Sequence, residues 1–145
     1  MDIIIRKALL TDATLINELS KQLGYESTIE DTSYYLSSII NLLNEEIVVA
    51  EYNSLPIAWM QLSLMLRVES GCFAEITGLV VEENYRSIGV GNLLIDYAKS
   101  WTYAKGINKL RVRTNIVRQR THTFYERNGF TLLKEQKVYE MVVCG

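Results

Sequence analysis

The sequence predicts a single α/β domain, residues 1–145, in which helices flank a mixed and mostly antiparallel β-sheet. Three observations lead to this class. The chain has 145 residues, of which 48% are hydrophobic and 22% charged, as in one globular domain with one core. Apolar runs and capped amphipathic segments follow one another in the order β-α-α-β-β-β-α-β-α-β-β. Only one strand–helix–strand segment, which carries Gly89 and Gly91, has the form of a parallel crossover.

The first part of the chain predicts one strand and two helices. Residues 3–7 are apolar and β-branched, which favours a strand. A helix capped by Thr11 or Asp12 is expected to run to about Leu23, where Gly24 follows. Residues 27–30 have capping-box spacing and predict a second helix to about Leu43. The expected inward positions are Ile16, Leu19 and Leu23 in the first helix, and Tyr35, Leu36, Ile39, Ile40 and Leu43 in the second.

The remaining elements centre on the crossover. Strands are expected at residues 46–52, 55–67 and 72–81, with a turn at 53–54. The last of these leads through the glycine loop into a helix at 88–105 and a parallel strand at 109–114. A helix at 117–128 and two closing strands, at 130–134 and 138–143, complete the prediction.

Charge and cysteine content argue against several function classes. The net charge of −2 does not favour nucleic acid or an anionic membrane as a partner. Cys72 and Cys144 form no CxxC pair, and with His122 as the one histidine a zinc site has too few ligands, so no metal is expected. No apolar run approaches the roughly 20 residues that span a bilayer. We therefore expect a cytoplasmic protein with reduced cysteines.

The glycine loop, Arg-Ser-Ile-Gly-Val-Gly at residues 86–91, joins a strand to a helix. Its two glycines allow close approach of the backbone to a ligand, and the helix start offers unpaired amides that attract phosphate. A Walker motif needs Gly-Lys-Ser/Thr, but Asn92 follows Gly91. The dinucleotide motif needs glycine or alanine at position 94, which is leucine. The loop therefore suits a pyrophosphate without matching either motif.

Two motifs resemble the GNAT superfamily of acetyl-CoA-dependent N-acetyltransferases. One is Leu79-Val80-Val81 followed by Arg86-x-x-Gly89-x-Gly91, which is similar to the family's Arg/Gln-x-x-Gly-x-Gly/Ala motif. The other, THTFYERNGF at residues 121–130, resembles the FYE-x-x-GF signature. The element order resembles the GNAT fold over nearly the whole chain. The resemblance implies an enzyme that moves an acetyl group from acetyl-CoA to a primary amine.

The resemblance also implies a binding mode for acetyl-CoA. The backbone of residues 79–81 bonds the pantetheine arm like an added strand, and the amides of residues 87–92 hold the pyrophosphate. The central strands splay at a bulge, for which Gly78 is a suitable place. Arg86 either contacts a phosphate or braces the loop. The expected cofactor-binding residues are Leu79, Val80, Val81, Arg86, Ser87, Ile88, Gly89, Val90, Gly91, Asn92, Asn115 and Arg118, the last standing where many members have asparagine.

Tyr125 and Glu75 are the candidate catalytic residues. By resemblance, Tyr125 is the general acid that protonates the departing thiolate; the alternative is that it only packs its helix onto the sheet. Glu75 resembles the glutamate base of the protein-lysine branch. Its alternatives are substrate binding or an exposed strand carboxylate, with water replacing a dedicated base. If strand alternation holds, one face carries Glu75, Thr77, Leu79 and Val81. For His122 we expect a structural or cofactor-adjacent role.

The acceptor side is expected at residues 23–35 and 64–71, which usually shape the pocket in this fold. Acidic and aromatic residues there suit a cationic amine, although solvated surface charge explains them equally: Tyr25, Glu26, Glu30, Asp31, Tyr34 and Glu69. A small cationic molecule is the preferred acceptor. The alternatives are a protein or peptide N-acetyltransferase and a non-catalytic acyl-CoA-binding module. A homodimer formed through an edge at residues 138–143 is left open.

Overall fold

The computed structural model describes residues 2–86, 88–114 and 119–144. The chain divides into two compact units, 1–113 and 114–145, and each is described by itself. Within the described residues, no helix combines the length and the apolar character needed to cross a membrane.

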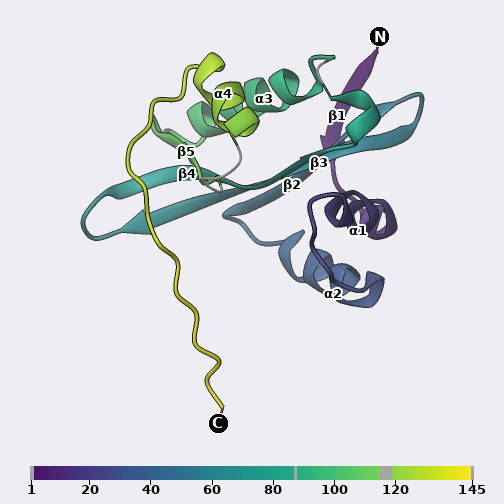
Figure 1. Cartoon of the computed structure of the whole chain (residues 1–145), viewed down its shortest axis with the longest axis horizontal. Coiled ribbons are helices and arrows are strands. Elements are labelled where there is room, and N and C mark those ends of the chain that lie inside the picture. The colour runs from purple at the N-terminus through teal and green to yellow at the C-terminus, as the bar shows by residue number, and fades with distance from the viewer. Residues whose placement is uncertain (1, 87, 115–118, 145) are drawn as a thin grey trace. The chain divides into compact units, whose positions relative to one another are not determined.

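The first unit is built on a five-stranded sheet in the order β1-β2-β3-β4-β5 (Figure 1). Its strands are β1 Ile3–Lys7, β2 Glu45–Tyr52, β3 Leu55–Arg67, β4 Gly71–Val81 and β5 Leu110–Val112. The first four strands pair antiparallel in sequence, and β4 pairs parallel with β5. The predicted crossover is therefore confirmed.

Helices cover both faces of this sheet (Figure 1). The helices α1, Ala13–Lys21, and α2, Ile29–Ile39, lie on one face, which we call the α1–α2 face. The buried cluster there joins both helices to β2 and consists of Ala8, Ala13, Ile16, Leu36, Ile47 and Val49. The helix α3, Val90–Ala104, lies on the opposite face, which we call the α3 face. Two short 3-10 helices, η1 Leu10–Asp12 and η2 Glu83–Tyr85, precede α1 and α3.

The predicted α2 begins one residue too early, because the capping-box spacing placed the N-cap at Ser27, and it ends too late. Thr28 is the N-cap, because its side chain accepts a hydrogen bond from the Asp31 amide at 3.0 Å. The helix ends at Ile39, since the chain must turn between 40 and 44 to enter β2. Of the five residues expected to face inward only Leu36 is buried; Ile39 and Ile40 are partly buried, and Tyr35 and Leu43 are exposed.

The register between β3 and β4 contains a β-bulge. Gln61 lies opposite Gly78 and Leu62 lies opposite Ile76, so Thr77 is the extra residue on β4. The bulge falls beside the glycine where we expected one.

This bulge changes which side chains share a face of β4. Glu75 lies opposite Ser63, on the α1–α2 face. Beyond the bulge, Gly78 and Val80 take that face, so Leu79 and Val81 turn to the α3 face. The expectation that Glu75, Thr77, Leu79 and Val81 share one face is therefore wrong, because one inserted residue reverses the alternation.

The second unit contains α4, Gln119–Arg127, followed by an extended segment. Residues 130–144 form no strand, so the predicted closing strands at 130–134 and 138–143 are wrong. Residues such as Val138, Val142 and Val143 are apolar and β-branched, but their side chains are exposed. A strand also needs a neighbouring strand for its backbone groups, and none of the five strands in the described residues has this segment as its neighbour.

Candidate functional site

The β4 strand has an open edge beyond the bulge. β5 pairs only with Ala74, Glu75 and Ile76, so residues 77–81 have no strand partner on that side within the described residues. The Glu82 amide donates to the Ile57 carbonyl of β3 at 2.8 Å, which turns the backbone groups of Val81 and Leu79 away from β3. An extended molecule can add to such an edge by main-chain hydrogen bonds, as a further strand would.

The open edge leads to the start of α3. Gly89 is the N-cap of this helix at φ 96°, and no side chain caps it. The amides of Val90 and Gly91 have no acceptor in the described part of the chain. Arg86 braces this connection, because its Nε donates to the Val81 carbonyl at 3.0 Å. The helix start therefore offers two amide donors and its positive dipole end to an anion.

Glu75 is buried on the α1–α2 face, with 5% of its surface exposed. Its Oε1 accepts a hydrogen bond from Arg113 Nε at 3.1 Å, an ion pair that we did not predict. The nearby Arg111 guanidinium lies 4.0 Å from the centre of the Phe73 ring. The burial rules out an exposed strand carboxylate. An Arg-x-Arg pattern on the strand next to Glu75 was the available signal.

A row of polar side chains crosses the α1–α2 face, and we did not predict it. Glu45 Oε1 accepts from Ser63 Oγ at 2.7 Å and from Gln61 Nε2 at 2.8 Å. Ser63 Oγ lies 3.3 Å from Thr77 Oγ1 at the bulge. The sequence did carry a signal for this row. Glu45 and Gln61 stand at positions of the strand pattern that share a face with the buried Ile47, where apolar residues are expected.

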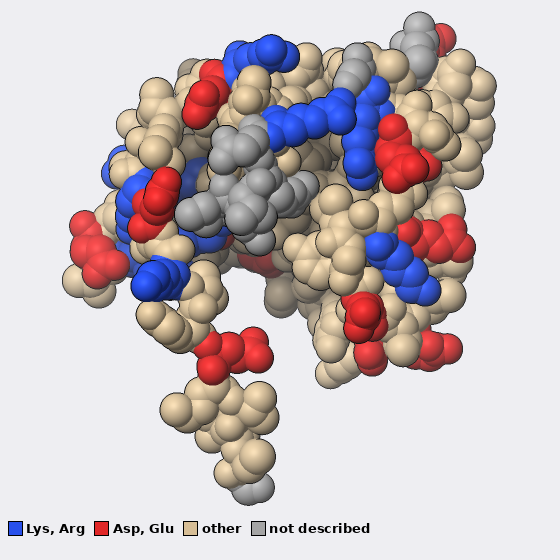
Figure 2. All heavy atoms as spheres, in the orientation of Figure 1, with Lys and Arg blue, Asp and Glu red and all other residues tan. Residues whose placement is uncertain are grey.

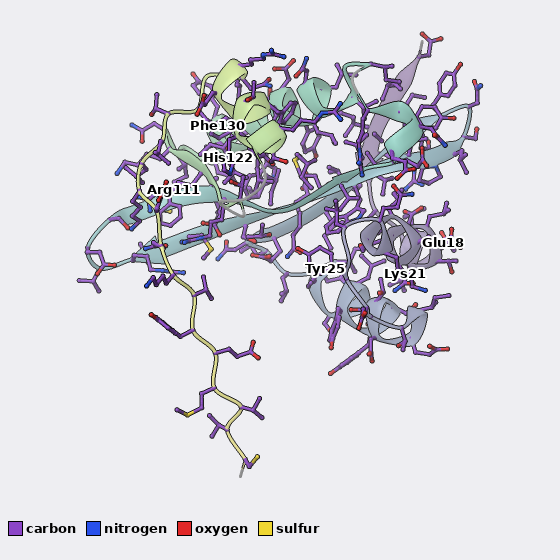
Figure 3. All side chains as sticks on the ribbon, viewed as in Figure 1. Glu18, Lys21, Tyr25, Arg111, His122 and Phe130 are labelled. Atoms are coloured by element: carbon purple, nitrogen blue, oxygen red, sulfur yellow. The ribbon has the colours of Figure 1, made fainter. Side chains whose placement is uncertain are left out.

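Tyr125 lies on α4 in the second unit and is 8% exposed. Its ring packs edge-on against Phe124 and Phe130, with ring centres 5.1 Å and 5.5 Å apart. His122 lies one turn earlier on the same helix (Figure 3). A packing role for Tyr125 is therefore present within this unit, and its role as an acid stays a prediction.

The family of the chain follows from its sequence profile. The profile described as Acetyltransferase (GNAT) domain matches residues 43–132, more than half of the chain. The chain belongs to the GNAT acetyltransferase family. It is accordingly an acetyl-CoA-dependent N-acetyltransferase, and acetyl-CoA is its acetyl donor.

Solved structures of similar fold cover nearly the whole chain. An aminoglycoside N-acetyltransferase, AAC(6')-Iy, in complex with CoA has a TM-score of 0.87 at 18% identity, over 97% of this chain and 95% of that one. The aminoglycoside 6'-N-acetyltransferase AAC(6')-Ih from Acinetobacter baumannii has 0.86 at 14%, over 98% and 99%. A transcriptional regulator from Bacillus halodurans has 0.86 at 19%, over 97% and 100%.

These likenesses confirm the predicted fold class. At such identities they show the fold alone, and the proteins in these structures are named for different functions. A search of curated proteins found no significant match.

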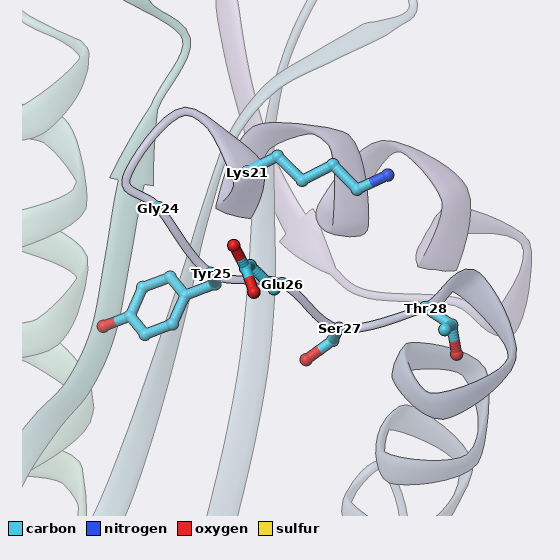
Figure 4. Close-up of a pocket in the computed structure, with 6 residues that line it drawn as sticks. All are labelled: Lys21, Gly24, Tyr25, Glu26, Ser27 and Thr28. Carbon is cyan, nitrogen blue, oxygen red and sulfur yellow. The ribbon is translucent and has the colours of Figure 1, made fainter.

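In this acetyltransferase the α1–α2 connection carries a pocket of about 410 Å³. Figure 4 shows its lining residues, which are Lys21, Gly24, Tyr25, Glu26, Ser27 and Thr28. Two residues of the expected acceptor rim, Tyr25 and Glu26, are among them. The other four residues of the expected rim lie elsewhere. Glu30, Asp31 and Tyr34 are in α2, and Glu69 is exposed in the β3–β4 turn.

Charge is mixed across the face that Figure 2 draws, where acidic and basic side chains alternate. That face carries no large patch of one sign. Three predicted residues, Ser87, Asn115 and Arg118, lie outside the described residues. The remaining cofactor candidates lie at the end of β4, in the connection that carries Arg86 and Ile88, and at the start of α3.

Proposed function

We propose that the protein acetylates a primary amine of a small cationic molecule, and that the whole chain acts as one catalytic domain. The observation that carries the proposal is the continuous path from the bulge, along the open edge of β4, to the uncapped start of α3. Pantetheine would bond Leu79 and Val81 as an added strand, and the pyrophosphate would accept hydrogen bonds from Val90 and Gly91. Acetyl-CoA supplies the activated acetyl group at the bulge end of this path.

Acidic side chains support a cationic acceptor. Glu75 and Glu45 lie on the α1–α2 face on either side of Ser63, in one row across three strands. Glu26 and Tyr25 line the pocket on the same side of the sheet. Carboxylates around a site attract an ammonium group over distances of about a Debye length. The aminoglycoside N-acetyltransferases of similar fold agree with this class of acceptor.

The acceptor binds as an ammonium ion, so its nitrogen loses two protons in the reaction. One proton leaves before attack to give the neutral amine; the nitrogen then bonds the acetyl carbon while the carbon–sulfur bond breaks, and a second proton leaves it. One proton is delivered to the sulfur, and the net reaction releases one proton to solvent. We assign Glu75 to the acceptor side, where it binds the ammonium group or takes its proton. We assign Tyr125 to the sulfur as general acid.

A panel of amines tests the function. We expect thiol release from acetyl-CoA with at least one of kanamycin, spermidine and lysinamide, which stand for aminoglycosides, polyamines and amino-acid derivatives. Release only with peptides, followed by mass spectrometry, would favour a protein acetyltransferase. CoA binding with no release for any amine would favour a non-catalytic acyl-CoA-binding module.

A further inference from the structure

Three side chains connect β2 to the bulge on β4. Ser63 Oγ is 2.7 Å from Glu45 Oε1 on one side and 3.3 Å from Thr77 Oγ1 on the other. Ser63 is buried, whereas Thr77 is exposed. A series of hydrogen bonds therefore leads from a carboxylate, through a buried hydroxyl, to an exposed hydroxyl at the bulge.

The chemistry of these groups fixes the direction of the hydrogen bonds. An ionised carboxylate only accepts, and a serine hydroxyl has one proton. Ser63 therefore donates to Glu45 and must accept from Thr77. The alternative acceptor for the Thr77 proton, the Gln61 carbonyl at 3.5 Å, also lies on β3. In either arrangement Thr77 donates toward β3, which leaves the lone pairs of its oxygen to accept a hydrogen bond from a ligand.

The position of Thr77 connects it with the reaction. β4 and β5 stop pairing at Ile76, and Thr77 is the next residue. This residue is the first of the unpaired edge, residues 77–81, and the position proposed to bond pantetheine, Leu79, lies two residues further along. A ligand group at the end of this edge would lie beside the Thr77 side chain.

We propose that Thr77 Oγ1 accepts a hydrogen bond from the nitrogen of the attacking amine, and that Ser63 and Glu45 are positioning residues that hold the hydroxyl in this sense. The inference rests on the proposed function. A hydroxyl whose proton points to β3 cannot donate to the thioester carbonyl oxygen. It selects an N–H donor instead, and it orients the nitrogen lone pair toward the acetyl carbon.

Removal of this hydroxyl tests the contact. With whichever of kanamycin, spermidine and lysinamide turns over, Thr77→Val should lower kcat/KM for the amine roughly 10- to 100-fold, because the lost hydrogen bond is made to a nitrogen that becomes positively charged as it attacks the acetyl carbon. The Kd for CoA should stay within about twofold. Thr77→Ser keeps the hydroxyl and should restore most of the activity. Equal kcat/KM in Thr77→Val and wild type would overturn the proposal, and so would a CoA Kd that rises as much as kcat/KM falls.

A double-mutant cycle tests the positioning role of Ser63. Ser63→Ala removes the hydroxyl that accepts the Thr77 hydrogen bond, so it should lower kcat/KM for the amine several-fold in the wild-type background, but not in Thr77→Val. Independent effects that multiply in the double variant would contradict the positioning role of Ser63. Glu45→Gln should likewise lower kcat/KM for the amine, because it changes the group that accepts the Ser63 proton. Glu46→Gln is its matched control, because Glu46 is the neighbouring residue on β2 and bonds Tyr97 on the α3 face. Urea unfolding of each variant separates lost activity from lost fold.

The two proposals fail in different ways. If none of the three amines releases thiol from the wild-type protein, the proposed function fails before any variant is made. If an amine is acetylated and Thr77→Val is fully active, the function stands and the Thr77 contact is wrong.

Discussion

Gly89 decides whether the start of α3 can hold an anion. Its φ of 96° is left-handed, where a side chain costs roughly 1–2 kcal/mol, except for residues such as asparagine that tolerate it better. Gly89→Glu also brings a carboxylate to the amides of Val90 and Gly91. We expect this variant to lose CoA binding in calorimetric titration, whereas Gly89→Asn should stay folded and bind CoA more weakly than wild type. Wild-type affinity in Gly89→Glu would contradict the loop assignment.

Tyr125 can be tested without changing its packing. Tyr125→Phe removes the hydroxyl and keeps the ring between Phe124 and Phe130. We expect kcat to fall roughly 10²- to 10⁴-fold, the usual contribution of general acid–base catalysis, with little change in the Kd for CoA. Unchanged turnover would leave this side chain with a packing role alone.

At the scale of elements, Asp12 joins β1 to the entrance of α1. Its carboxylate accepts two hydrogen bonds from Arg6, at 2.8 Å and 2.9 Å, and one from the Leu9 amide at 2.7 Å. The Arg6 guanidinium holds the pKa of Asp12 below its usual range. Asp12 therefore contributes stability above its unfolded pKa of about 3.9, and this contribution is lost as the pH falls through the lower folded pKa.

Asp12→Asn should reveal this contribution. We expect it to lower the free energy of unfolding by roughly 1–3 kcal/mol at pH 7, since the Arg6 guanidinium then keeps, among the described residues, only Glu51 as an ionic partner. The difference from wild type should shrink at pH 3 and below. Urea unfolding at the two pH values measures it, and an equal difference at both would mean that the ion pair is not its source.

Most elements were predictable because the pattern of apolar residues and caps is local. The bounds of β3 were predicted to the residue, and Gly71 and Gly106 mark real ends of elements. The bulge at Thr77 reverses the faces of β4, and no local pattern reports a single inserted residue. Gly78 gave a hint, but its physical reason is tertiary: a Cβ there would lie 2.7 Å from the Trp59 ring.

The site was predictable only in part, because several of its contacts join residues that are far apart in the sequence. The glycine loop and Glu75 are visible as motifs. Arg113 pairs with Glu75 from 38 residues away, and Ser63 meets Thr77 across 14 residues. Such pairs arise from strand register, which the sequence specifies only through the whole sheet.

At the scale of the whole molecule, hydrogen exchange over the C-terminal segment tests whether the predicted closing strands are absent. Residues 131–144 form no strand and expose apolar side chains, including Leu132, Tyr139 and Met141. For the chain alone we therefore expect fast amide hydrogen exchange over this segment and slow exchange in β2 and β3. Protection that rises with protein concentration would show instead that these residues pair with a second copy, as an apolar, strand-prone segment can.

The contact between Trp59 and Gly78 also gives the protein a built-in optical reporter. The sequence has two tryptophans, and Trp101 lies on α3, so Trp101→Phe would leave one indole, directly over the bulge. Its emission would then respond to whatever enters beside Thr77. Titration with CoA and with an amine, each followed by fluorescence, would record binding of the cofactor and of the acceptor separately and without a label.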